Sequence, residues 1–368
     1  MKKFLALILA LVMALSLVAC GGGNTNTDDN QNTDGNDNPD ATTYKVAMIT
    51  DYGDITDQSF NQTTYEACKE YCEAGSLDFK YFKPVGDSTA DRVAMIESAI
   101  DEGFNIIVMP GYAFGGAIVE AAPKYKDVKF VALDVSKGDY LEAGVGAAGE
   151  TYDYEPDNWD LAKYADLSNV YTMIYQEELC GYMAGYATVK MGYTKLGYAG
   201  GMAVPAVIRY GYGFVQGANA AAKELGATVE MKYIYTNTFS PDASITAAMD
   251  TWYADGTQVV FACGGGIYVS IAEAAKKANA KIVGVDVDQA PIIDALANED
   301  TTITSAMKSP ALIWTPTMSA SPPVTAPLGA TPSPPTITPL WWPLCSMAPS
   351  PSATTSPRSP LTSPPTSL

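Results

Sequence analysis

The sequence predicts an α/β protein with two similar, doubly wound lobes. Short apolar runs alternate with amphipathic stretches between residues 44 and 308, which is typical of strands connected by helical crossovers. Two of the runs, Ile106–Met109 and Val259–Ala262, are continuously apolar, as expected for parallel strands covered on both faces. The alternation restarts after about residue 170. We therefore expect a first lobe formed by 44–174 with 304–308, and a second lobe formed by 175–303.

Each element follows from its local pattern. Strand candidates are apolar runs that end near Gly, Pro or Asp, and helix candidates repeat apolar residues at a helical spacing. Right-handed crossovers between parallel strands place helices on both faces of a sheet. The predicted strands are Tyr44–Asp51, Leu77–Pro84, Asn105–Gly111, Lys129–Val135, Lys195–Gly201, Thr228–Tyr235, Gln258–Gly265, Lys281–Asp288 and Thr302–Lys308. The predicted helices include Asp91–Gly103, Glu177–Gly192, Val207–Gly226, Ala243–Gly256 and Tyr268–Ala280.

The N-terminal residues are typical of an export signal. Lys2 and Lys3 precede an apolar stretch at 4–18 that is too short to span a bilayer. Leu-Val-Ala-Cys, ending at Cys20, resembles a bacterial lipobox, which implies a signal peptide at 1–19 and lipidation of Cys20. The protein is then expected on the extracytoplasmic face of the cell membrane, anchored by lipid, with 20–43 as a flexible polar linker. The alternative is an ordinary signal peptide with a chance cysteine.

The composition excludes several classes of function. A formal net charge of −19 argues against nucleic acid as a partner, because few cations are available to neutralise phosphates. The chain has no histidine, which removes Ser-His and Cys-His nucleophile pairs. It also lacks a paired Cys-x-x-Cys motif, so a zinc site is not expected. We predict no cofactor and no metal.

The last sixty residues depart from this pattern. Segment 309–368 contains no Asp, Glu or Lys, carries one charge at Arg358, and is rich in Pro, Ser and Thr. We expect a disordered tail, either the translated product of a frameshift or a natural stalk. Since prolines prevent a long helix there, we also expect the first lobe to lack a covering helix and this polypeptide to bind ligand weakly.

The loop after the first strand carries the most specific motif. It reads D-x-G-x-x-x-D-x-S-F-N-Q from Asp51 to Gln62 and leads into a helix. In open α/β sheets, ligands bind beyond the carboxyl ends of the strands, so this loop is expected to face a ligand. The motif resembles the basic membrane protein family of ABC-transporter lipoproteins, which includes purine-nucleoside receptors. The resemblance continues through Tyr-Gln-Glu-Glu at 175–178, Ala-Gly-Tyr at 184–186, Gly-Tyr-Ala-Gly-Gly at 197–201, Gly-Phe-Val-Gln-Gly at 213–217 and Gly-Val-Asp-Val-Asp-Gln at 284–289.

The resemblance implies a type I periplasmic-binding-protein fold, in which two α/β lobes joined by three crossing strands close over a ligand by a hinge motion. It places Phe60 and Tyr210 on opposite faces of a purine, and Asn61 and Asp134 at the edge of the base. The alternatives are a helix staple for Phe60, core packing for Tyr210, and a cap or turn for Asp134.

The remaining predicted contacts concern the sugar and the loops. Asp286 is expected to accept hydrogen bonds from two ribose hydroxyls, and Lys308, on a predicted crossing strand, to reach the same sugar. Gly265, within a run of three glycines, would let backbone amides approach the ligand, with a plain tight turn as the alternative. Asp51 either contacts the ligand or positions the first loop.

The predicted function is a binding lipoprotein that captures a nucleoside and delivers it to the permease of an ABC importer as a monomer. The aromatic slot favours a purine nucleoside. One alternative is the same scaffold binding another small polar ligand such as a sugar, or serving a signalling receptor. A second is an enzyme in which Asp286 and Asp288 form a D-x-D metal motif. The export signal and the absence of a P-loop or nucleophile elbow argue against an enzyme.

Overall fold

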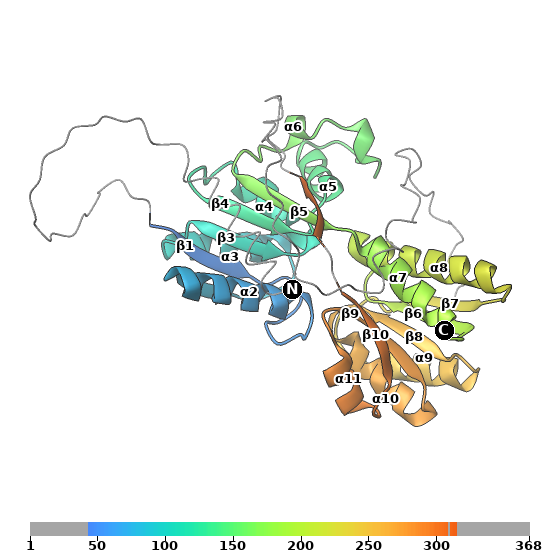
Figure 1. Ribbon diagram of the computed structural model, residues 1–368. Coiled ribbons are helices and arrows are strands. Elements are labelled where there is room, and N and C mark those ends of the chain that lie inside the picture. The colour runs from blue at the N-terminus through green and yellow to red at the C-terminus, as the bar shows by residue number, and fades with distance from the viewer. Residues whose placement is uncertain (1–42, 308–309, 315–368) are drawn as a thin grey trace, which may run out of the picture. The chain divides into compact units, whose positions relative to one another are not determined.

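The computed structural model describes residues 43–307 and 310–314 (Figure 1). The predicted signal peptide, the lipidation site Cys20, nearly all of the linker, Lys308 and most of the predicted tail lie outside the described residues. The predictions made for them are not tested by this structure.

The first lobe is built on a six-stranded sheet with the order β11-β5-β4-β3-β1-β2. All of its described neighbours pair in parallel except β11, which is antiparallel to β5. The strands are β1 (Lys45–Ile49), β2 (Asp78–Phe82), β3 (Ile106–Pro110), β4 (Lys129–Leu133), β5 (Val170–Tyr175) and β11 (Pro310–Trp314). The helices are α2 (Phe60–Gly75), α3 (Thr89–Asp101), α4 (Gly115–Ala121), α5 (Lys137–Ala147) and α6 (Leu161–Tyr164), with short 3-10 turns η1 (Tyr112–Phe114) and η2 (Pro156–Asn158).

The second lobe is built on a five-stranded parallel sheet with the order β10-β9-β8-β6-β7. Its strands are β6 (Lys195–Gly200), β7 (Glu230–Tyr235), β8 (Val259–Cys263), β9 (Lys281–Asp286) and β10 (Thr302–Met307). Its helices are α7 (Glu177–Lys190), α8 (Pro205–Leu225), α9 (Ala243–Ala254), α10 (Tyr268–Ala278) and α11 (Ala290–Leu296), and the 3-10 turn η3 (Gly265–Ile267) precedes α10.

The apolar runs form cores on both faces of each sheet, as parallel strands require. Successive residues of one strand contribute to opposite cores: Ala47 packs with α3, α4 and α5, whereas Val46 and Met48 pack with α2. In the second lobe, Tyr198 of β6 packs with α7 and α8, and Ala199 packs with α9 and α10. Predicted strands and observed strands therefore agree wherever a continuous apolar run is buried on both sides.

Two boundaries were predicted wrongly. Residues 304–308 were assigned to the first lobe, but β10 pairs in parallel with β9 at the edge of the second sheet. The tail was expected to contain no secondary structure, but residues 310–314 form β11 beside β5 (Figure 1). Pro310 is the first residue of this edge strand, a position that tolerates the missing N–H of proline.

Helices α7 and α8 cross very closely because glycines lie at their contact. A Cβ atom on Gly181 would clash with the carbonyl oxygen of Tyr210, and one on Gly217 would clash with that of Tyr182. Removing the side chains lets the two backbones touch, which fixes the N-terminal part of α8 relative to that of α7. This matters because Arg209 of α8 and Glu177 of α7 meet near the cavity described below.

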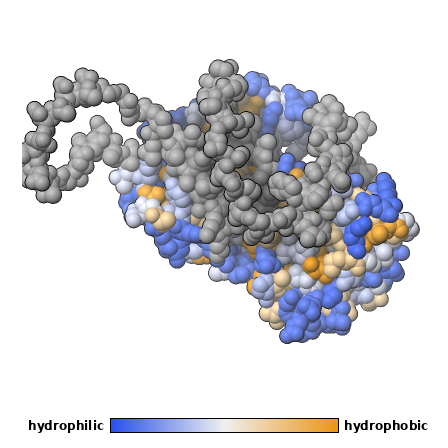
Figure 2. Space-filling model, viewed as in Figure 1, coloured by the Kyte–Doolittle hydropathy of each residue, from blue (hydrophilic) through white to orange (hydrophobic). Residues whose placement is uncertain are grey.

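The visible face of the molecule is mostly hydrophilic, with smaller hydrophobic areas between the polar ones (Figure 2). Large apolar side chains that stay exposed include Val85 and Tyr212. Within residues 43–307 and 310–314, no helix combines the length and the apolar character needed to cross a membrane.

Candidate functional site

A cavity of about 420 Å³ lies at the carboxyl ends of strands from both sheets. Each sheet has the strand order 2-1-3-4-5 of flavodoxin-like folds, and ligands of such sheets bind where the order reverses, outside the strand ends. The cavity is bordered by the residues that follow β1, β3 and β4 in one lobe and β6, β8 and β9 in the other. Of the predicted site residues, seven line it: Asp51, Phe60, Asn61, Asp134, Tyr210, Gly265 and Asp286.

The loop between β1 and α2 is organised by Asp57. One of its carboxylate oxygens accepts hydrogen bonds from the backbone N–H groups of Ser59 (2.8 Å) and Gln62 (3.1 Å). The other oxygen accepts from the backbone N–H of Asn61 (3.1 Å) and from its side-chain amide (3.0 Å). Burial raises the pKa of Asp57, and these hydrogen bonds partly offset that effect. Asp57 thus satisfies the free N–H groups of the first turn of α2.

Asn61 and Asp51 are hydrogen bonded to each other. The Asn61 amide nitrogen donates to Asp51 Oδ1 at 2.8 Å, and its amide oxygen accepts from the Asp51 backbone N–H at 3.2 Å. Asp51 Oδ1 also accepts from the backbone N–H of Gly53 at 3.1 Å, while burial raises the pKa of the Asp51 carboxyl. These bonds favour the interpretation that Asp51 positions the first loop. They also engage the side-chain amide of Asn61, which was predicted to form hydrogen bonds with the edge of a base.

Two aspartates occupy equivalent positions in the two lobes. Asp134 directly follows β4 and Asp286 is the last residue of β9, and both have a φ of 63°. Aspartate tolerates this left-handed conformation better than most residues, and it turns the chain sharply where each strand meets the cavity. Asp286 accepts hydrogen bonds from Ser59 Oγ (2.5 Å) and from Tyr210 Oη (3.3 Å).

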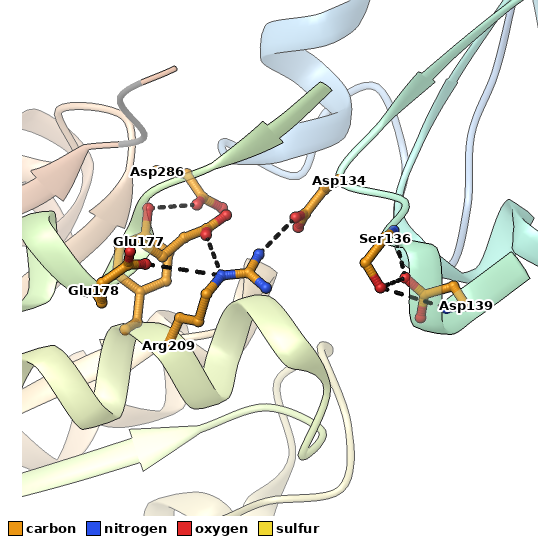
Figure 3. A network of polar contacts seen from close by, with 8 residues as sticks. Asp134, Ser136, Asp139, Glu177, Glu178, Arg209 and Asp286 are labelled. Carbon is orange, nitrogen blue, oxygen red and sulfur yellow. Dashed lines mark hydrogen bonds and ion pairs between the residues drawn. The ribbon is translucent and has the colours of Figure 1, made fainter. Parts of the chain in front are cut away.

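Arg209 is a charged residue near the cavity that sequence reasoning missed. Its Nη2 atom donates to Asp134 Oδ1 at 2.9 Å, and its Nε atom donates to Glu177 Oε2 at 2.8 Å (Figure 3). Asp134 belongs to the first lobe, whereas Arg209 lies in α8 and Glu177 in α7 of the second. Arg209 therefore connects the lobes through one of the predicted ligand-binding carboxylates. The sequence does contain a signal for Arg209: it is the one charged residue in an otherwise apolar stretch directly before Tyr210, a predicted site residue.

The aromatic lining is larger than the predicted pair. Phe60 meets Tyr175 edge to face, with ring centroids 5.9 Å apart. Tyr210 is only 1% exposed and packs edge to face on Phe261, so core packing, the alternative to stacking, describes most of its contacts. Three further rings, missed by sequence reasoning, border the cavity, and Tyr52 contacts the other two: its ring centroid lies 6.1 Å from that of Tyr112 and 6.2 Å from that of Phe239.

The three glycines after β8 pack against backbone. A Cβ on Gly264 would lie 2.8 Å from the backbone nitrogen of Gly201, and one on Gly265 would lie 3.0 Å from the carbonyl oxygen of Phe239. The N–H of Gly266 donates to that same oxygen at 2.8 Å. These contacts favour the tight-turn interpretation, and they bring the Phe239 segment to the edge of the cavity.

The lining is acidic. It contains Asp51, Asp54, Asp57, Asp134 and Asp286 but one lysine, Lys83, whose ammonium pairs with Asp54 at 2.5 Å. Among the described residues, no group of three or more Asp, Glu or Cys side chains is arranged to hold a metal ion. Carboxylates next to aromatic rings suit a polar, uncharged organic molecule that carries several hydrogen-bond donors.

Three comparisons place the chain among known proteins. The Bmp family model, described as "ABC transporter substrate-binding protein PnrA-like", matches residues 44–313. A Lactococcus lactis protein named "ABC transporter nucleoside-binding protein BmpA" is 26% identical over 264 residues, which cover 67% of this chain and 65% of that protein. An uncharacterized lipoprotein of Pyrococcus horikoshii is 26% identical over 286 residues, covering 76% of this chain and 62% of the relative. The chain thus spans slightly less than two thirds of each of these two relatives.

Among solved structures, an ABC transporter solute-binding protein from Aeropyrum pernix resembles the chain with a TM-score of 0.53 at 20% identity. The match covers 66% of this chain and 62% of that one. At this identity the similarity concerns the fold alone. Together with the two sheets, whose strands are parallel except for β11, it confirms the predicted type I periplasmic-binding-protein fold.

Proposed function

The chain belongs to the Bmp family of PnrA-like ABC transporter substrate-binding proteins, and from this premise we propose that it captures a purine nucleoside in the cavity and delivers it to an ABC importer. Members of this family are the substrate-binding components of transporters, so the protein is a binding protein and not an enzyme. The metal-motif alternative for Asp286 and Asp288 is thereby removed. The name of the Lactococcus relative supports a nucleoside as the ligand.

The observation that carries the proposal is the arrangement of the cavity itself. Asp134 and Asp286 lie at equivalent strand ends of the two lobes, and both line the same space as Phe60. A carboxylate has about four acceptor positions, and Asp286 uses two of them in the hydrogen bonds to Ser59 and Tyr210. The other two can accept from adjacent ribose hydroxyls, while the aromatic rings stack on the base. A volume of about 420 Å³ is within the usual range for small-molecule sites.

The location follows from the same family. The Pyrococcus relative is named a lipoprotein, and residues 17–20 of this chain resemble a lipobox. We propose that Cys20 carries the lipid and that the lobes lie on the extracytoplasmic face of the membrane, where the linker at 20–43 lets them reach the importer. Palmitate labelling of cells that express the wild type and Cys20→Ala, followed by membrane fractionation, tests this. Loss of label and of membrane association in the variant is expected, and an unchanged fractionation would contradict it.

The ligand is tested by titrating the full chain with inosine, adenosine, uridine and free ribose in a calorimeter. Stacking contributes about 1–3 kcal/mol per base, so a purine nucleoside should bind roughly 5- to 150-fold more tightly than ribose. Equal affinity for inosine and ribose would remove the base from the proposal, and tighter binding of ribose would favour a sugar receptor.

A further inference from the structure

Ser59 stands at the N-cap position of α2, but its hydroxyl does not cap the helix. No hydrogen bond joins its side chain to the first turn, and Asp57 accepts from the N–H groups of Asn61 and Gln62 instead. Serine at this position normally uses its oxygen for that purpose. The hydroxyl of Ser59 instead donates to Asp286 Oδ2 of the other lobe, at 2.5 Å. The side chain is 1% exposed, so this bond is shielded from water.

The adjacent residue makes a second bond between the lobes. Gln58 has a φ of 54°, and its carbonyl oxygen accepts a hydrogen bond from the side-chain nitrogen of Gln289 at 3.2 Å. Gln289 is fully buried, and its amide oxygen accepts from the Val285 backbone N–H at 2.9 Å, which fixes the orientation of the amide. Gln58 of the first lobe and the buried amide of Gln289 in the second thus form a hydrogen bond next to the one between Ser59 and Asp286.

We propose that Gln58 and Ser59, together with Asp286 and Gln289, form a closure clasp that retains the ligand by holding the lobes together at the cavity. The inference rests on the proposed function, because it assigns to Asp286 a second task besides accepting from ribose. Both bonds of the clasp join the lobes, so both are lost when the lobes separate. The Ser59 bond is a short hydroxyl–carboxylate bond, a class stronger than bonds between neutral groups.

The clasp also explains why Asp286 is held from two sides. Tyr210 Oη of its own lobe contacts Oδ1, and Ser59 Oγ of the opposite lobe contacts Oδ2. The carboxylate is therefore oriented fully only when the first lobe is in place. Ser59 is a positioning residue: it acts on the ligand through Asp286 and through the closed arrangement, which lowers the rate at which the ligand leaves.

The test uses the full chain with inosine as the probe. In stopped-flow measurements, Ser59→Ala should raise koff at least about tenfold and change kon less than about threefold. The variant lacks the hydrogen bond to the Asp286 carboxylate, which forms only when the lobes are closed, so it destabilises the closed complex and has little effect on the first encounter with the ligand. Ser59→Thr, which keeps the hydroxyl, should restore koff. The matched control is Ser88→Ala, because the Ser88 hydroxyl is a true cap that accepts from the Asp91 N–H in an exposed capping box. That variant should lower Tm and leave koff unchanged.

A second readout does not need the ligand. Ser59→Ala in the first lobe should speed hydrogen–deuterium exchange of residues 286–296 in the second lobe, whereas Ser88→Ala should not. If the wild type binds inosine and Ser59→Ala leaves koff unchanged, the clasp is wrong while the proposed function stands. If the wild type binds no nucleoside, the proposed function fails, and the exchange of 286–296 decides the clasp: faster exchange supports it and unchanged exchange overturns it.

Discussion

The two lobes share the strand order 2-1-3-4-5, but they border the cavity differently. Equivalent positions match where the strands end: Gly111 and Gly264 each precede a 3-10 turn, and Asp134 and Asp286 share one backbone conformation. The first connection does not match. In the first lobe it runs over residues 50–59 and carries three aspartates, whereas in the second it is 201–204 and carries no charge.

This comparison shows that the position of the cavity and the chemical character of its lining have different origins. The repeated strand ends determine where the cavity lies, because parallel strands of one order bring the same loops together in each lobe. The unmatched loop of the first lobe supplies most of the charge, and it also supplies Ser59 and leads into Phe60, the first residue of α2. The lobes differ in packing as well. Two helices, α7 and α8, cover one face of the second sheet. Among the described residues of the first lobe, only one helix, α2, contributes to the corresponding core.

The largest expected effect concerns the contact between α7 and α8 in the second lobe. Gly217→Val would place side-chain carbons where the carbonyl oxygen of Tyr182 lies. We expect a loss of at least about 3 kcal/mol in the free energy of unfolding, the upper part of the range for overpacking. Urea unfolding followed by circular dichroism measures it. Gly146→Ala in α5 is the control, since a Cβ there meets nothing within 4 Å, and it should be neutral or stabilising.

The second prediction concerns how the helices of the first lobe begin. Asp139 closes a capping box with Ser136 at the start of α5, whereas the equivalent α11 has no side-chain cap. Burial raises the pKa of Asp139 to about 6 from its usual 3.8. Between these values the folded protein holds a proton that the unfolded chain has lost, so stability falls as pH rises from about 4 to 6.

Asp139→Asn should remove this dependence and raise the stability at pH 7 by roughly 2–3 kcal/mol, since one pKa unit is worth about 1.4 kcal/mol. Urea midpoints between pH 4 and pH 7 measure the effect. Asp91 is the contrasting case, because its bonds with Ser88 lower its pKa, so its contribution is present at neutral pH and lost as pH falls. Parallel pH profiles for the wild type and Asp139→Asn would contradict the prediction.

The third prediction concerns Asp286, the strand end of the second lobe. Asp286→Ala removes a charged acceptor from the cavity, so affinity for inosine should fall at least about tenfold, in line with 1.5–3 kcal/mol for bonds to charged groups. Calorimetry on the full chain measures this. The control is Asp288→Ala, two residues later, whose exposed carboxylate contacts the Ala290 N–H at the start of α11. An unchanged dissociation constant for Asp286→Ala would assign that residue a structural role.

The smallest effect is expected from the aromatic lining. Phe60→Ala should weaken inosine binding by about 1–3 kcal/mol and leave ribose binding nearly unchanged, because a base stacks and a sugar does not. Competition between the two ligands in the wild type and the variant distinguishes the cases. An equal loss for inosine and ribose would indicate that Phe60 only supports the loop, through its contact with Tyr175.

Most of the fold could be predicted from local sequence, with two instructive exceptions. The predicted central strands are present because an apolar run buried on both faces is itself the signal for a parallel strand. The predicted strands β2, β7 and β10 lie at sheet edges and are less buried. β5 was missed, since its run continues directly into α7 and reads locally as part of a connection. β11 was missed because a proline-rich composition does not report pairing, and this strand exists by antiparallel pairing with β5.

The sequence by itself determined the α/β class, the two lobes and which strand ends would carry aspartate, glycine and phenylalanine into a site. These features depend on residue type and short-range periodicity, both of which can be read directly from the sequence. Only the tertiary structure decided the partners of those residues. Asp134 meets Arg209 across 75 positions of sequence, and Ser59 meets Asp286 across 227. Such pairs depend on how the two sheets are placed and on how closely α7 and α8 cross. No local sequence pattern reports contacts between residues so far apart in the chain.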